Sequence, residues 1–111
     1  MESTRQSKIA RLIQKDMGEI FQMESRNLFG GKMISVTVVR VSPDLGLAKV
    51  YLSIFPSDKS EDTLELIRMS AKKLRYTLAQ RVRHQLRVVP ELAFFIDDSL
   101  DYIENIDNLL E

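Results

Sequence analysis

The sequence predicts an α+β fold with the element order helix, strand, strand, long helix, strand, short helix. Apolar residues recur at helical spacing near the start of the chain, and two segments rich in β-branched residues follow around a turn. A second, longer helical pattern then precedes a short apolar strand. The 111 residues, of which 44% are hydrophobic and 29% charged, fit one compact domain spanning residues 1–111.

The first helix is expected from Thr4 to about Glu24. Its buried stripe comprises Ile9, Leu12, Ile13, Met17, Ile20 and Phe21. Ser3 or Thr4 is expected to cap it, because a hydroxyl there can accept a hydrogen bond from an amide of the first turn. Cations recur every three or four residues and should gather along one flank of this helix: Arg5, Lys8, Arg11 and Lys15.

Two strands are expected next, at Met33–Val41 and Leu47–Phe55. Both are rich in β-branched residues and alternate between apolar and polar positions. The stretch between them, residues 42–46, contains proline, aspartate and glycine and predicts a turn in which Gly46 tolerates positive φ. The strands should therefore form an antiparallel hairpin.

The long helix should begin at a Ser60 cap and end before Pro90, because the residue before proline is pushed toward extended geometry. Its apolar stripe comprises Leu64, Ile67, Ala71, Leu74, Leu78, Val82 and Leu86. Leu92–Ile96 is then predicted as a third strand, and Tyr102–Leu110 as a short amphipathic helix.

Charge is segregated in the second half of the chain. Residues 68–90 include cations but no acid, and residues 91–111 include acids but no cation. On a helical wheel one sector opposite the apolar stripe holds Lys72, Lys73, Arg83 and Arg87, while the stripe is flanked by Arg75 and Arg81. Such a face attracts RNA phosphates, but cations late in a helix also stabilise its dipole. The absence of interspersed acids favours RNA, because acid–base pairs would better suit a face that is merely solvated.

The residue types do not favour an enzyme or a metal site. There is no cysteine, and His84 is the only histidine, so a thiol nucleophile and the usual ligands of transition metals are missing. Asp97 and Asp98 are adjacent at a strand end, where side chains point to opposite faces and cannot converge on one bond. No secretory signal or apolar run of membrane-spanning length is visible, so a cytoplasmic location is expected.

Two stretches of sequence and one helix position carry a family resemblance. They are Val41–Ser53 (VSPDLGLAKVYLS), Arg87–Ser99 (RVVPELAFFIDDS) and the pair Leu74–Arg75 on the long helix. Together they resemble ribosome-binding factor A, a family of bacterial assembly factors for the small ribosomal subunit. The likeness covers nearly the whole chain, with the elements in the same order.

The resemblance implies a type II KH-like fold, in which the long helical segment is two helices meeting at a kink. The kink falls at Ser70-Ala71-Lys72, where the family has an Ala-x-Gly motif, so Lys72 stands in place of glycine. The resemblance also implies binding to the 30S subunit and its 16S rRNA, support for late rRNA maturation and growth in the cold, and no enzymatic activity. No cofactor, small-molecule substrate or membrane partner is expected, and the protein should be a monomer.

The residues expected to contact RNA phosphates are Lys72, Lys73, Arg75, Arg81, Arg83 and Arg87. A second group comprises Arg5, Lys8, Arg11 and Lys15. The alternative is a protein-interaction module that docks through the sheet or the acidic tail helix, with a basic helix that is only solvated. A small enzyme ranks third, because no acid, base, nucleophile or metal ligands converge.

Overall fold

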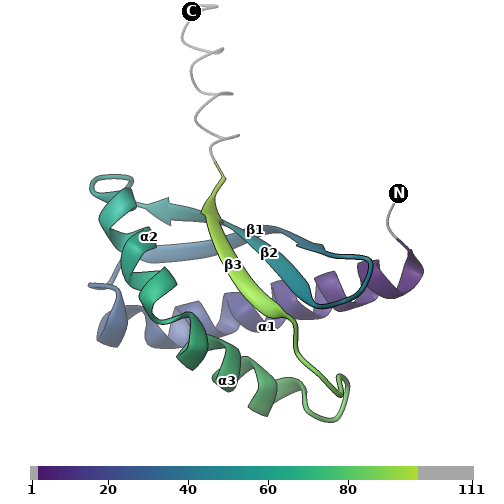
Figure 1. Cartoon of the computed structure of the whole chain (residues 1–111). Coiled ribbons are helices and arrows are strands. Elements are labelled where there is room, and N and C mark those ends of the chain that lie inside the picture. Colours follow the sequence, from purple (N-terminus) through teal and green to yellow (C-terminus); the bar gives the residue numbers. More distant parts are fainter. Residues whose placement is uncertain (1–2, 98–111) are drawn as a thin grey trace, which may run out of the picture.

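The computed structural model describes residues 3–97, and these confirm the expected α+β order with a kink between two helices (Figure 1). The elements are α1 (Thr4–Leu28), β1 (Met33–Val41), β2 (Leu47–Phe55), α2 (Ser60–Met69), α3 (Ala71–Val82) and β3 (Glu91–Ile96). The expected short helix at Tyr102–Leu110 and the acidic residues after Asp97 lie outside the described residues.

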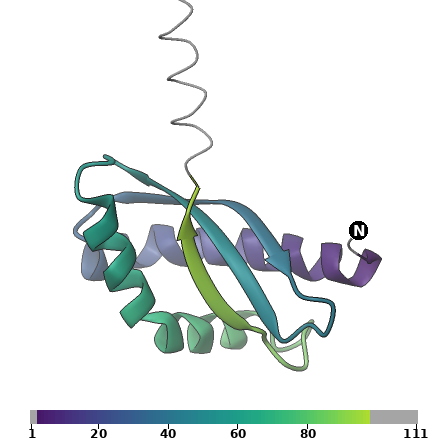
Figure 2. The same ribbon diagram turned by 45° about the horizontal axis from the view of Figure 1, so that its top comes forward.

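The three strands form a sheet in the order β1-β2-β3, and the helices cover one of its faces (Figures 1 and 2). β1 and β2 pair antiparallel, as expected for the hairpin, with Met33 opposite Phe55. β3 pairs parallel to β2, with Leu47 opposite Glu91. A parallel pair needs a crossover connection, and here α2 and α3 provide it.

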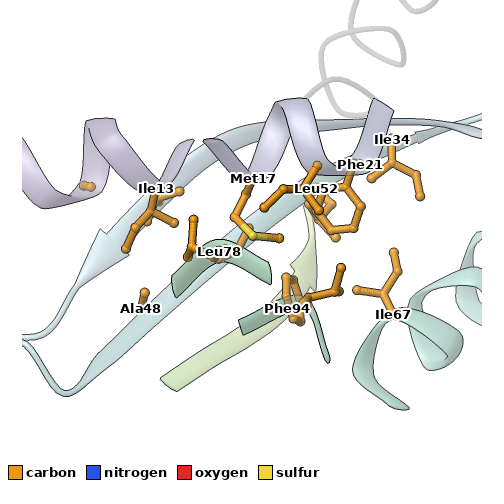
Figure 3. Close-up of a cluster of buried hydrophobic side chains, with 14 of the residues drawn as sticks. Ile13, Met17, Phe21, Ile34, Ala48, Leu52, Ile67, Leu78 and Phe94 are labelled. Carbon is orange, nitrogen blue, oxygen red and sulfur yellow. The ribbon is translucent and has the colours of Figure 1, made fainter. Parts of the chain in front are cut away.

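The core lies between the helices and the covered face of the sheet (Figure 3). Ile13, Met17 and Phe21 on α1 are fully buried, which confirms the stripe predicted for this helix. The Phe21 ring packs edge-on against Phe94 of β3, with 6.1 Å between ring centroids. The three described helices all lie on this side of the sheet, so they leave its opposite face uncovered (Figure 2).

The start of α1 is fixed by a reciprocal cap. The backbone N–H of Gln6 donates to the Ser3 hydroxyl (3.1 Å), and the backbone N–H of Ser3 donates to Gln6 Oε1 (2.8 Å). The side-chain amide of Gln6 also donates to the Val41 carbonyl at the end of β1 (2.8 Å). Gln6 is a buried polar residue with 7% exposure, so one side chain both caps α1 and joins it to the sheet.

The Gln6→Ala variant is expected to lose about 1–3 kcal/mol of unfolding free energy, because the buried Val41 carbonyl loses this donor and the Ser3 amide loses its acceptor, Gln6 Oε1. Ser3→Ala is the control, since it removes only the hydroxyl that accepts from the Gln6 backbone amide, leaves the bond from Gln6 to Val41 in place and is expected to lose only about 1 kcal/mol. Urea denaturation measures both values. Equal losses in the two variants would show that the bond from Gln6 to the sheet contributes nothing.

α1 is longer than expected and ends at Leu28. The chain then turns back toward β1 through two consecutive glycines with positive φ, Gly30 (66°) and Gly31 (77°). The Gly31 amide donates back to the Ser25 carbonyl (2.9 Å), and Phe29 tucks under the helix against Phe21. Phe29 is the C-cap of α1 and is buried, so its contact with Phe21 stabilises the extra turn of the helix.

The hairpin turn differs in detail from the expectation. Leu45, with φ of 63°, adopts the left-handed conformation, so the assignment of positive φ to Gly46 is wrong. Gly46 is instead approached closely by the Asp44 carboxylate, which would lie 3.3 Å from an added Cβ. Asp44 accepts hydrogen bonds from the Ser42 hydroxyl (2.6 Å) and the Gly46 amide (3.0 Å), and these hold its pKa below the ordinary value.

The long helix is corrected at its two ends. Lys59, with φ of 57°, occupies the N-cap position expected for Ser60, and it makes no side-chain cap hydrogen bond. The kink lies at Ser70, within the expected Ser70-Ala71-Lys72 segment, but the second half of the helix stops at Val82 rather than continuing to Pro90. Residues 83–90 form the connection that brings the chain back beside β2, so a helix continued to Pro90 would leave no segment to make this return.

Candidate nucleic-acid interface

The break at Ser70 sets the direction of α3. Ser70 has φ of −93° and ψ of 6°, a backbone conformation open to any L-residue, so the break requires no glycine. Its amide donates to Leu66 and Ile67 of α2, and its carbonyl accepts from Leu74 of α3. The two helices can therefore each turn an apolar stripe toward the sheet. Lys72, at the position of the family's glycine, lies within α3 instead.

The face of α3 that points away from the core is basic. Leu74, Leu78 and Val82 are buried, whereas Lys72 and Lys73 are exposed on the opposite side. Arg83 follows the helix as its C-cap with helical φ and ψ, so it continues the same exposed side. α3 contains no acidic residue, and this side therefore presents cations over about 16 Å of helix.

Arg75 lies on the flank of α3 and is partly buried. Its Nε and Nη2 donate to the Val89 carbonyl at 3.2 and 2.7 Å, which ties the helix to the segment leading into β3. Val89 and the following Pro90 are both buried. The Arg75 side chain predicted to contact RNA is therefore engaged in holding the α3–β3 connection.

Arg81 also has protein partners. Its guanidinium pairs with Asp16 (3.0 Å between Nε and Oδ1) and with Glu19, both on α1. These contacts join α3 to α1 across the helical layer. They also offset the charge of Arg81, so it adds less to the basic surface than the lysines of α3.

Arg87 does not share the helical face of α3, so its predicted place on the helical wheel is wrong. It lies in the α3–β3 connection and lines a groove of about 760 Å³ at the end of the molecule where three segments gather (Figure 1). α1 contributes Arg5 and Lys8 to this groove. The β1–β2 turn forms another wall, with Asp44, Leu45 and Gly46. The fold thus brings Arg87 near cations that are distant in sequence.

Arg11 and Lys15 complete the predicted α1 set and are exposed, but they do not line the groove. The predicted flank of α1 is therefore divided, with Arg5 and Lys8 turned toward the groove. Among the described residues, none offers a hydrogen bond or ion pair to the side chains of eight of the ten predicted cations. Two of these eight are Arg11 and Lys15, and the other six lie on the exposed side of α3 or line the groove: Arg5, Lys8, Lys72, Lys73, Arg83 and Arg87. We call these six residues the open cations.

Two features of the surface are missing from the sequence prediction. Tyr76 is exposed in the middle of the basic side of α3, and its sequence signal is its spacing of three and four residues from Lys73 and Lys72. On the uncovered sheet face, Tyr51 stacks on Phe95 with 5.5 Å between centroids, and the Arg68 guanidinium lies 5.7 Å from the Phe95 ring. The β-sheet register that pairs Tyr51 with Phe95 was not predicted.

The other residues considered for chemistry are placed as follows. His84 is exposed in the turn after α3, and Asp97 accepts a hydrogen bond from the Thr37 hydroxyl (2.6 Å), while Asp98 lies outside the described residues. Within residues 3–97 no group of three or more His, Asp or Glu side chains is placed to hold a metal ion. No helix in this same part of the chain is long and apolar enough to cross a bilayer.

Comparison with known proteins gives a consistent result over nearly the whole chain. The family model described as ribosome-binding factor A matches residues 5–110. The chain belongs to the ribosome-binding factor A family. A family member from Flavobacterium johnsoniae is 55% identical over 111 residues, covering 99% of this chain and 85% of that protein. A ribosome-binding factor A from Cytophaga hutchinsonii is 50% identical over 110 residues, covering 99% and 83%.

Solved structures of ribosome-binding factor A support the same KH-like fold. The crystal structure of the Thermus thermophilus protein matches with a TM-score of 0.67 and 26% identity, covering 82% of this chain and 94% of that one. A homology model of Thermus thermophilus ribosome-binding factor A, fitted into the cryo-EM map of a complex with the 30S subunit, matches with a TM-score of 0.64 and 27% identity. That match covers 80% of this chain and 91% of the other. The type II KH-like arrangement expected from the sequence is thereby confirmed.

Proposed function

We propose that this chain binds the immature small ribosomal subunit through its 16S rRNA and supports late maturation of that rRNA, including during growth in the cold. Its family is one of ribosome-binding factors, and a structural neighbour is described in complex with the 30S subunit. In this proposal the chain acts in the cytoplasm as a monomer and a binding protein. It catalyses no reaction and uses neither cofactor nor small-molecule substrate.

The observation that carries the proposal is the basic, acid-free exposed side of α3. The chain has a formal net charge of zero, so attraction to a polyanion must come from the distribution of charge. The open cations collect on that side of α3 and in the groove, where phosphates could reach them without breaking a contact within the described part of the protein.

The open cations would position the protein on rRNA by contacting phosphates, which fixes orientation without reading sequence. Arg75 and Arg81, which were also predicted to contact RNA, have a supporting role in this proposal because they hold the α3–β3 connection and α1 in place. Arg11 and Lys15 would add long-range attraction from α1.

The salt dependence of binding tests this proposal. Binding of the wild-type chain to purified small subunits and to isolated 16S rRNA is measured between about 50 and 200 mM salt. If each of the six open cations contacts one phosphate, log K should fall against log salt with a slope of about −4 to −5. Affinity that does not change with salt would favour the protein-interaction alternative. The absence of binding to either target would contradict the proposal.

A further inference from the structure

Tyr76 is an aromatic side chain with no ring or hydrogen-bond partner among residues 3–97, and its exposed fraction is 66%. The other described tyrosine, Tyr51, is stacked on Phe95 and partly buried. Phe55 is as exposed as Tyr76, at 68%, but the chain after it carries acids at positions 58, 61 and 62. Tyr76 is therefore the exposed ring of the described surface that lies in a basic environment.

The helix places Tyr76 at the centre of that environment. Lys72 and Lys73 precede it by four and three residues, and Arg83 follows it by seven, so all three lie on the same side of α3 as the ring. Gln80, one turn after Tyr76, is exposed and uncharged. A planar group can therefore stack on the ring without an acidic side chain of α3 beside it.

An exposed ring between cations suits single-stranded RNA more than a duplex or a protein. Unpaired bases can stack on an aromatic ring while the adjoining phosphates meet Lys or Arg, whereas paired bases in a duplex hide their faces. The centres of protein–protein interfaces also favour aromatic residues, but they are depleted in lysine, and here two lysines adjoin the ring.

We propose that Tyr76 stacks on an unpaired base of the bound RNA while Lys72, Lys73 and Arg83 contact the neighbouring phosphates. This inference rests on the proposed RNA binding and adds to it a preference for a single-stranded segment. The ring would supply affinity that is insensitive to salt, and the cations would supply the part that is sensitive to it.

The first test compares Tyr76→Ala with Tyr76→Phe, using a short fluorescently labelled single-stranded RNA and the same sequence as a duplex. Tyr76→Ala is expected to weaken binding of the single strand about ten-fold or more, with the salt slope and the duplex affinity unchanged. Tyr76→Phe keeps the ring and should retain wild-type affinity. Wild-type binding of the single strand by Tyr76→Ala, or an equal loss for the duplex, would overturn the stacking proposal.

The second test reads stacking directly. The chain contains no tryptophan, so Tyr76→Trp introduces a single tryptophan, whose fluorescence can be excited separately from that of the remaining tyrosines. Its emission should be quenched by the single-stranded RNA and not by the duplex, and equal emission with and without the bound single strand would overturn stacking.

If Tyr76→Ala loses binding to small subunits but not to isolated RNA, the ring contacts a protein instead. If the wild type binds no RNA at all, the proposed function itself fails, an outcome distinct from loss of stacking alone.

Discussion

Replacing Lys72, Lys73 and Arg83 together with glutamine is expected to weaken binding to small subunits about 100-fold at about 0.1 M salt. These side chains are exposed along one side of α3 and would each neutralise a phosphate. Removing three phosphate contacts should make the slope of log K against log salt less steep by about 2–3. Since the electrostatic contribution vanishes near about 1 M salt, this change in slope amounts to about two decades of affinity at 0.1 M.

The matched control replaces Arg26, Lys49 and Lys59 with glutamine. These three cations are also exposed, and the substitution changes net charge by the same amount, but they lie on α1, on the uncovered sheet face and before α2. The control is expected to keep nearly the wild-type salt slope, and circular dichroism should show that both triple variants are folded. Equal losses of affinity would mean that overall charge, and not the exposed side of α3, attracts the subunit.

The Phe94→Ala variant is expected to lose about 3–5 kcal/mol of unfolding free energy. Phe94 is 2% exposed and packs against Phe21, so truncating its ring leaves a cavity where β3 meets α1 (Figure 3). Domains of this size are stable by only about 5–15 kcal/mol, so the variant should approach the limit of folding at room temperature. The urea midpoint measures the effect.

The neighbouring phenylalanine provides the control, because it points to the other side of the same strand. Phe95 lies on the uncovered face, where it stacks on Tyr51 beneath Arg68. Phe95→Ala removes the same number of atoms but leaves a site open to water, so a loss of only about 1 kcal/mol is expected. A loss as large as that of Phe94→Ala would contradict the assignment of the two sheet faces.

Local patterns in the sequence were sufficient for the hairpin strands and the start of α1. The hairpin strands at Met33–Val41 and Leu47–Phe55 have the predicted bounds, since alternation and the intervening turn act over a few residues. The Ser3 cap was also predictable, because capping involves only the first helical turn. The parallel pairing of β3 with β2 depends on contacts distant in sequence, and no local pattern specifies it.

The end of α3 shows why the second half was harder to predict. Leu86 continues the helical stripe in the sequence, yet the helix stops at Val82. The chain must return to place Val89 and Pro90 in the core beside Arg75, and this tertiary requirement overrides the local pattern. The predicted helical wheel therefore extended past the true end of the helix and misplaced Arg87.

The residue types of the candidate interface could be predicted from the sequence, but the contacts that their side chains make could not. The absence of acids around Lys72 and Lys73 is visible in the sequence, as is their spacing from Tyr76. The engagement of Arg75 with a backbone carbonyl and the pairing of Arg81 with Asp16 depend on how α3 packs. For the same reason the meeting of Arg87 with Arg5 became apparent only in the folded chain.

The groove at the end of the molecule has walls from three segments, and one of them leads into β3, whose partner strand lies far earlier in the chain. An unfolded chain, or one in which β3 has detached, has no such groove. A polyanion that occupies it therefore binds the folded form alone and shifts the folding equilibrium toward that form by mass action. Ribosomal RNA that occupied the groove would therefore raise the temperature at which this protein unfolds.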